Sequence, residues 1–247
     1  MIGRVQWRFA NVGSTQQIAF HLAELGACHG TVVRADYQSA GRGRMDRRWE
    51  SPRGSALMFS VLLRPQRPMH QLGTISISIA QALASVFADL STDPVHIKWP
   101  NDVLVDGKKV SGILVQSRTG LNPVAVLGIG INIQTPKSNL LEGATSLHQY
   151  TSEPVDPDAL FSTLLDRIES AWSNLKPELT DRQIGQLDSQ LWLKGDMVSI
   201  LDADREIEGH VLGIAESGGL RLRIDGHERE IVAGEIRRGP RPIRREN

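Results

Sequence analysis

The run Ala-Leu-Met-Phe-Ser-Val-Leu-Leu, residues 56–63, is almost entirely apolar. Pro65 and Pro68 follow it closely and end any regular element there. A short apolar run with such a boundary predicts a buried β-strand. Beyond the prolines, apolar residues recur at helical spacing from Ile75 to Leu90. That pattern predicts a long amphipathic helix after the strand.

Further strands are expected on both sides of this run. Alternating or β-branched stretches predict them at residues 5–9, 31–37, 95–99, 103–105, 109–115 and 123–133. The pair Asp106-Gly107 is a hairpin signal between two of these strands. Near the start, Ser14 and Thr15 precede apolar residues at helical spacing, so either hydroxyl is a candidate N-cap. A helix N-terminus also has free N–H groups that can hold an anionic or polar ligand.

The last third of the chain has a different pattern. Residues 153–158 contain two prolines among acidic residues and are interpreted as a linker, and the helix expected after it has apolar residues at core spacing. After Trp192, short alternating runs separated by glycine turns suggest a small β-barrel. The arginine-rich tail from Arg237 to Arg245 is interpreted as a solvated end, with a weak nucleic-acid contact as the alternative.

Length and composition narrow the choice of protein class. A chain of 247 residues is expected to form one large domain, or one large and one small domain. The formal net charge is zero, so nothing overall indicates a nucleic-acid or membrane partner. The single cysteine, Cys28, excludes an intramolecular disulfide and fits a reducing, cytoplasmic compartment. No apolar stretch is long enough to predict a signal peptide or a transmembrane helix.

Residues 39–49, Ser-Ala-Gly-Arg-Gly-Arg-Met-Asp-Arg-Arg-Trp, follow the strand expected at residues 31–37. Gly41 and Gly43 allow the backbone to approach a ligand closely, and arginine guanidinium groups are suited to phosphate or carboxylate. The stretch, called the arginine loop below, is therefore either an anion clamp or a solvated basic turn. It is not a Walker A loop, because the chain contains no G-x-x-x-x-G-K-[ST]. It is not a G-x-G-x-x-G dinucleotide loop either, because the last glycine position is Asp46.

A second polar group comes from Lys98-Trp99-Pro100-Asn101-Asp102 and Lys109. Asp102 and Lys109 bracket one predicted hairpin, so they can face a common cleft. A carboxylate there suits Mg²⁺ held together with nucleotide phosphates. A lysine can hold two repelling anions together, and at about 4 Å with an effective dielectric near 20 such a contact contributes roughly 4 kcal/mol. These residues indicate phosphoryl or nucleotidyl chemistry, unless Asp102 is only a turn residue and Lys109 only a surface lysine.

Taken together, these motifs resemble the biotin protein ligases over nearly the whole chain. The resemblance rests on Ser14-Thr15, on Gln38 with the arginine loop, and on residues 98–102. It continues through Lys-Val-Ser-Gly-Ile-Leu at 109–114, Gly-Ile-Gly-Ile-Asn at 128–132, and the small β-domain at the end. Each motif is weak alone, but their order and spacing are specific.

The resemblance implies a two-step reaction. The carboxylate of biotin attacks the α-phosphate of ATP, with Mg²⁺ present, to form biotinyl-5′-AMP and pyrophosphate. A lysine of a biotin carboxyl carrier domain of an acyl-CoA carboxylase then accepts the biotin and AMP leaves. The implied fold is an α/β (α+β) catalytic domain with a mixed β-sheet at residues 1–189, followed by an SH3-like β-barrel with a basic tail at residues 190–247.

The resemblance also implies roles for individual residues. Lys109 and Arg44 are the implied catalytic residues, with Lys109 bridging the biotin carboxylate and the α-phosphate, and Asp102 is the implied Mg²⁺ ligand. The implied biotin-binding residues are Ser14, Thr15, Gln16, Gln38, Gly41, Arg42, Gly43, Arg44, Lys109, Gly128 and Gly130. The implied ATP-binding residues are Arg42, Arg44, Arg47, Trp49, Lys98, Asn101 and Asn132.

The sequence departs from the family pattern at two places. Gln16 stands where the family often has asparagine, and Met45-Asp46 stand where many members have a basic residue and glycine. Asp46 lowers the positive charge of the loop, which is expected to weaken its hold on an adenylate. Some members carry an N-terminal helix-turn-helix, but here the catalytic pattern begins at Ser14, so no DNA binding is expected.

Two other functions stay open at this point. A lipoate or octanoate ligase of related fold would need a longer, apolar acyl tunnel. A non-catalytic module that binds anions or nucleic acid could use the arginine loop and the tail, although the neutral net charge argues against it. A homodimer paired through a free strand edge is a further hypothesis, for which no strand is marked.

Overall fold

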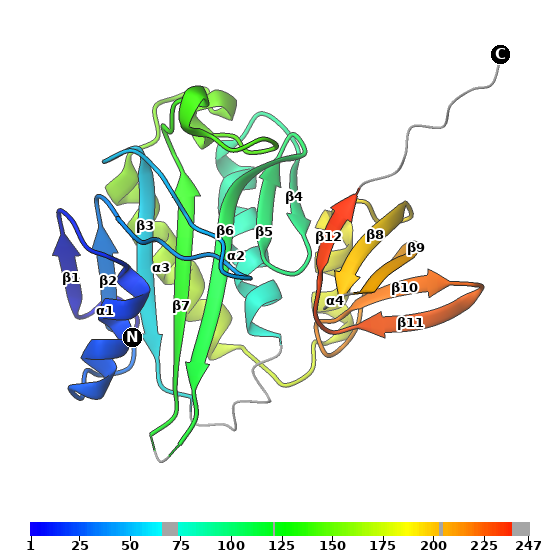
Figure 1. Ribbon diagram of the computed structural model, residues 1–247, viewed down its shortest axis with the longest axis horizontal. Helices are drawn as coiled ribbons and strands as arrows, with labels where there is room; N and C mark the ends of the chain where they lie inside the picture. Colours follow the sequence, from blue (N-terminus) through cyan, green and yellow to red (C-terminus); the bar gives the residue numbers. More distant parts are fainter. Residues whose placement is uncertain (66–73, 121, 203–204, 239–247) are drawn as a thin grey trace.

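The computed structural model describes residues 1–65, 74–120, 122–202 and 205–238. Its larger unit is built on a seven-stranded sheet with the order β1-β2-β3-β7-β6-β5-β4 (Figure 1). Strands β1 and β2 pair in parallel and all other neighbours pair antiparallel, so the sheet is mixed as expected. The strand bounds are β1 Gln6–Phe9, β2 Val32–Ala35, β3 Ala56–Leu63, β4 Val95–Lys98, β5 Asp102–Val105, β6 Lys108–Arg118 and β7 Val124–Asn132.

The apolar run at residues 56–63 is strand β3, with the predicted bounds, and every residue in it is buried. Successive side chains of a strand point to opposite faces. Phe59 and Val61 belong to the main core together with α2 and α3, whereas Leu62 packs into a smaller core with α1. Helices cover both faces of the strand, which explains why it lacks polar alternation. The helix bounds are α1 Thr15–Glu24, α2 Ile75–Leu90, α3 Pro157–Ser173 and α4 Asp181–Gln190, with short 3₁₀ turns η2 Lys137–Asn139 and η3 Leu147–Tyr150.

The C-terminal unit is a five-stranded sheet with the order β11-β10-β9-β8-β12. Its neighbouring strands all pair antiparallel, which confirms a small β-domain. Among the residues that the structure describes, no pairing joins the edge strands β11 and β12, so strand pairing does not close the expected barrel. The strand bounds are β8 Met197–Asp202, β9 Arg205–Ile214, β10 Leu220–Ile224, β11 His227–Ile231 and β12 Glu235–Arg238.

The beginning of the predicted solvated tail is instead a strand. Arg237 and Arg238 belong to β12, which pairs with β8. Ile236 of this strand lies opposite Ile200 of β8 and is buried. The remaining tail residues, 239–247, lie outside the described residues. The alternating pattern of β12 is too short to separate it from a charged end by sequence alone.

The predicted linker at 153–158 is also partly wrong. Asp156 is the N-cap of α3, and its carboxylate accepts hydrogen bonds from the backbone N–H groups of Asp158 and Ala159. Pro157 is the first helical residue, a position where proline's missing N–H has no cost. Helix α4 was not predicted, because only Leu187 of its residues is buried and an apolar stripe is lacking. Its start is stabilised by a capping box between Thr180 and Gln183.

The two units are joined through buried contacts beside β4 (Figure 1). The indole N–H of the buried Trp99 donates to the carbonyl oxygen of Gly218 at 3.0 Å, and the N–H of Trp192 donates to Ile97 O at 2.9 Å. The division of the chain at residue 189 stays a prediction. Among the helices of the described residues, none has the length and apolar character needed to cross a membrane.

Candidate functional site

A cavity of about 440 Å³ lies over the β6–β7 part of the larger sheet. The loop between β2 and β3, which includes the arginine loop, crosses in front of these strands (Figure 1). All the candidate site residues from the sequence line this cavity except Gly41. The chain segments that supply them are the start of α1, the arginine loop, the β4–β5 turn, and strands β6 and β7.

The arginine loop is a tight two-stranded turn. Arg42 and Arg48 form an antiparallel bridge, and the N–H of Gly43 donates to Arg47 O at 2.7 Å. Met45 and Asp46 at the tip both have positive φ, 53° and 57°. This is the geometry of a type I′ turn, in which glycine or asparagine is preferred. The departure from the family pattern at Met45-Asp46 therefore puts two side chains into a conformation that L-residues adopt at a cost.

Gly41 has a structural place in this loop. A Cβ atom there would overlap the carbonyl oxygen of Trp49, and the N–H of Trp49 donates to Gly41 O at 3.1 Å. Gly41 thus allows the two arms of the loop to approach, and it lies outside the cavity lining.

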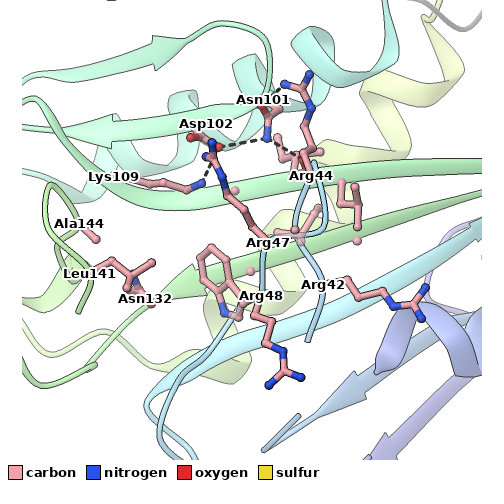
Figure 2. Close-up of a pocket in the computed structure, with 18 of the residues that line it drawn as sticks. Arg42, Arg44, Arg47, Arg48, Asn101, Asp102, Lys109, Asn132, Leu141 and Ala144 are labelled. Carbon is pink, nitrogen blue, oxygen red and sulfur yellow. Dashed lines mark hydrogen bonds and ion pairs between the residues drawn. The ribbon is translucent and has the colours of Figure 1, made fainter. Parts of the chain in front are cut away.

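Two arginines of the loop are tied to distant parts of the chain. Arg44 donates to the side-chain oxygen of Asn101 at 2.8 Å and to Gly234 O at 3.2 Å. Arg47 makes a two-pronged ion pair with Glu235 at the start of β12, with Nη1 to Oε1 at 2.6 Å. The C-terminal unit therefore holds the loop over the cavity. Figure 2 shows the guanidinium groups of Arg42 and Arg48 directed away from this cluster.

The ion pair and the burial alter the acid–base properties of these groups. The hydrogen bond to Arg47 holds the pKa of the Glu235 carboxyl below its ordinary value and raises the pKa of Arg47. Burial lowers the pKa of Arg44 and of Lys98, against the opposing influence of Asp102 and Glu235. Both cations are thus partly stripped of water, which strengthens their interaction with an anion in the cavity.

The predicted meeting of Asp102 and Lys109 is present. Lys109 Nζ lies 2.8 Å from Asp102 Oδ1, which also accepts from the Asn101 side chain at 3.1 Å (Figure 2). Asn101 is held in turn by donating to Ile113 O at 2.9 Å. A register shift between Val103 and Leu104 in the β5–β6 hairpin accompanies this arrangement. The hairpin thus places an anion–cation pair at the wall of the cavity.

Trp49 lies on the glycine-rich surface of the sheet. A Cβ at Gly130 would come within 2.5–2.8 Å of its indole ring, and one at Gly112 within 3.3 Å. Its indole N–H is buried and has no hydrogen-bond partner among the described residues. Lys109 Nζ lies 5.9 Å from the ring centre. The glycine at 130 therefore makes room for an aromatic ring that faces the cavity.

The start of α1 supplies uncharged polar groups at the other end of the cavity. Ser14 is the N-cap by backbone conformation, but its buried hydroxyl caps nothing and has no partner among the described residues. The N–H of Thr15 donates to the Gln38 side chain at 2.7 Å, and its hydroxyl lies 2.9 Å from that of Ser60. Gln16 packs against Gly128. This end of the cavity offers an unused buried hydroxyl, which is suited to a ligand with hydrogen-bonding groups.

Sequence reasoning missed several lining residues. Residues 139–144 cover the Lys109 side, where the N–H of Lys109 donates to Gly143 O at 2.8 Å. Asn132, at the end of β7, accepts a hydrogen bond from Thr135 at 3.2 Å and faces this segment in Figure 2. Glu235 and Trp192 come from the C-terminal third. No motif or periodicity marked residues 139–144, Trp192 or Glu235, whereas Asn132 is one of the predicted ATP-binding residues. Trp192 and Glu235 reach the cavity only through the docking of the two units.

In the part of the chain that the structure describes, no group of three or more His, Cys, Asp or Glu side chains gathers as a metal site. Asp102 is held by Lys109 and Asn101, and the cavity lining also includes the carboxylates of Glu50, Glu142 and Glu235.

Comparison with known proteins identifies the family. The model of the biotin/lipoate A/B protein ligase family matches residues 9–133, half of the chain, and that of the biotin protein ligase C terminal domain matches residues 195–239. The chain belongs to the biotin/lipoate A/B protein ligase family. Both matched regions of this ligase-family chain contribute side chains to the cavity, Arg44 from the first and Glu235 from the second.

The relatives of this ligase-family chain differ in how much of their own length the match covers. The bifunctional ligase/repressor BirA of Bacillus subtilis is 38% identical over 160 residues, which is 62% of this chain and 49% of that protein. The chain thus spans about half the length of the first curated relatives it matches. The biotin--[acetyl-CoA-carboxylase] ligase of Paracoccus denitrificans is 33% identical over 243 residues, covering 92% of this chain and 98% of that one.

A solved structure has the same architecture. The biotin protein ligase from Aquifex aeolicus in complex with biotin and ATP is 29% identical, with a TM-score of 0.76, over 95% of this chain and 98% of that one. The agreement covers both units and confirms the expected mixed α/β domain followed by a small antiparallel β-domain.

Proposed function

We propose that this chain is a biotin protein ligase that activates biotin with ATP and transfers it to a carrier protein. The observation that carries the proposal is one cavity with two unlike ends. Cationic side chains converge on one end, and a buried, unpartnered hydroxyl and amides line the other. Two ligands would together use both ends: a nucleoside triphosphate and a carboxylic acid with a polar head group. The relative from Paracoccus denitrificans is named for this activity, and the Aquifex aeolicus structure holds biotin and ATP.

In the first step, a carboxylate oxygen of biotin attacks the α-phosphorus of ATP. A new O–P bond forms, the bond to the β-phosphate oxygen breaks, and pyrophosphate leaves with the electron pair. The reaction brings two anions together, so cations that neutralise both lower the barrier. Lys109 is placed by its β6 backbone bond to Gly143, and Arg44 by Asn101 and Gly234. These supports hold the two cations before substrate binds, which reduces the reorganisation needed during the reaction.

We propose Mg²⁺ as the accompanying ion, with Asp102 as its protein ligand. Mg²⁺ is commonly bound by one or two carboxylates together with substrate phosphates, and a carboxylate in a wall that also carries cations fits that pattern. When bound, the ion supplies further neutralisation of the phosphates. Asp102 is held in place for this by Asn101 and Lys109.

In the second step, the amine of a lysine on a carboxyl carrier domain attacks the carbonyl carbon of biotinyl-5′-AMP. An amide bond forms, the carbonyl–phosphate oxygen bond breaks, and AMP leaves. We propose the carrier domain of an acyl-CoA carboxylase as acceptor, in line with the name of the Paracoccus denitrificans relative. Three statements stay predictions from the sequence. They are that the protein does not bind DNA, that it is located in the cytoplasm, and the hypothesis that it forms a homodimer.

The first test is pyrophosphate release from ATP and Mg²⁺ with biotin, with lipoate in a parallel reaction. Release with biotin alone supports the proposal, and biotin transfer to a purified carrier domain then tests the second step. Release with lipoate alone replaces biotin as the substrate, an outcome that the family name leaves room for. Release with neither acid, together with salt-dependent DNA binding, would favour the anion-binding module.

A further inference from the structure

Lys98 is held differently from the other cations at its end of the cavity. Arg47 and Lys109 each form an ion pair with a carboxylate, and Arg44 donates to an amide oxygen and a backbone carbonyl. Among the described residues, no carboxylate lies within ion-pair distance of Lys98. Its ammonium nitrogen lies instead over the indole ring of Trp192, 5.5 Å from the ring centre. An uncharged aromatic face thus takes the place that a polar or charged group has for the neighbouring cations.

The position of Trp192 is fixed by the backbone next to Lys98. Leu191 and Ile97 are both buried and form a parallel bridge, and the N–H of Trp192 donates to Ile97 O at 2.9 Å. Ile97 directly precedes Lys98 on β4. The contact that joins the segment after α4 to the larger sheet therefore also places the indole ring beside the lysine.

The surroundings of Lys98 leave its charge available to a ligand. Asp102 and Glu235 favour its charged form from a distance, but each is already paired, with Lys109 and Arg47 respectively. An aromatic face attracts a cation through its quadrupole and carries no net charge. The ring can therefore orient the ammonium group without neutralising it. Lys98 and the indole both line the cavity, so an anion bound there can reach the ammonium group.

We propose that Trp192 is a positioning residue that holds the Lys98 ammonium group toward the triphosphate of ATP. This inference rests on the proposed function, in which the cationic end of the cavity receives the nucleotide. A carboxylate at this position would also hold the lysine, but it would compete with the phosphates for the same charge. Trp192 acts through Lys98, so its effect should vanish when the lysine has no charge.

The test is a double-mutant cycle on Trp192→Leu and Lys98→Met. Leucine keeps apolar bulk and removes the ring, whereas methionine keeps most of the length of lysine and removes the charge. ATP and biotin affinities are measured by calorimetry, KM for ATP by pyrophosphate release, and folding by thermal unfolding. The control is Trp172→Leu, the same change at a partly buried tryptophan of α3 that lies outside the cavity lining.

Trp192→Leu is expected to weaken ATP binding and raise the KM for ATP about three- to tenfold, with biotin affinity within about twofold of the parent. In the Lys98→Met background the same change should alter ATP affinity less than about 1.5-fold. Trp192→Phe, which keeps an aromatic face, should stay within about twofold of the parent. Trp172→Leu should leave ATP affinity unchanged. An equal loss in both backgrounds would mean that Trp192 only joins the two units, and would overturn the proposal.

A second variant keeps the test decisive if Trp192→Leu does not fold. A tetrafluorinated indole introduced at position 192 keeps the shape of the ring and removes most of its attraction for a cation. It is expected to weaken ATP binding about twofold or more, and an unchanged affinity would overturn the proposal.

The parent protein separates failure of this inference from failure of the proposed function. A parent that releases pyrophosphate with neither biotin nor lipoate would overturn the proposed function. The cycle measured on ATP binding alone would then still decide whether Trp192 positions Lys98. A parent that binds no ATP would overturn both proposals.

Discussion

Replacing Lys109 with methionine gives the most direct test of how this cavity works. Methionine keeps most of the length and the apolar stem of lysine and removes only the charge. Lys109 Nζ lies 2.8 Å from Asp102 Oδ1, and 36% of its side chain is exposed. In Lys109→Met, Asp102 loses its cation and adds an unpaired negative charge to a wall where two anionic substrates must meet.

The magnitude follows from the geometry. A unit charge at about 4 Å contributes roughly 4 kcal/mol at an effective dielectric near 20, and less at a partly exposed site. Each 1.36 kcal/mol corresponds to about tenfold in rate. Lys109→Met is therefore expected to lower kcat/KM for biotin-dependent pyrophosphate release about 100- to 1,000-fold. Thermal unfolding should stay close to that of the parent, since a partly exposed ion pair contributes little to stability.

The matched control is the neighbouring residue. Lys108 pairs with Asp106 at 3.0 Å, half of its side chain is exposed, and it is not part of the cavity lining. Lys108→Met is expected to retain activity within about threefold of the parent. Our reasoning would be refuted if Lys109→Met kept near-parent activity, or if Lys108→Met lost as much.

Three further predictions concern the loop and stability. Asp46→Gly is expected to raise the free energy of unfolding by about 0.5–1 kcal/mol in a denaturant titration, because glycine adopts the positive φ of the turn tip without strain; destabilisation would contradict this. Glu235→Gln is expected to cost about 1 kcal/mol at neutral pH. Because the hydrogen bond to Arg47 lowers the pKa of Glu235, this contribution is fully present above the ordinary carboxyl pKa. It is lost as pH falls from there through the lowered pKa of the folded protein, so the two proteins should converge in stability in acid. Burial lowers the pKa of His29, so its unfolded form binds the proton more readily, and stability should fall as pH drops below the ordinary value of 6.5. His29→Asn, which keeps an acceptor for the N–H of Arg64, should show a flatter dependence of stability on pH in that range; an unchanged slope would exclude His29 as its source.

Much of the fold was predictable because its signals are local. The buried strand at 56–63 and the helix at 75–90 follow from apolar runs and helical spacing within each segment. The Asp106-Gly107 turn brings Lys109 to Asp102 within a few residues, so this pair of the candidate site was also predictable. Helix α4 and strand β12 were missed because their apolar patterns are too sparse or too short to register.

The sequence by itself determined most of the elements, the charged groups and the family resemblance, because periodicity, turn residues and motif spacing are properties of neighbouring residues. Only the tertiary structure decided which distant side chains meet. Arg47 and Glu235 pair although they are 188 residues apart, and Gln16 reaches Val126 from 110 residues away. No local signal encodes such contacts. They exist because two sheets dock and a helix packs on a strand, and burial then selects the side-chain lengths and charges that fit.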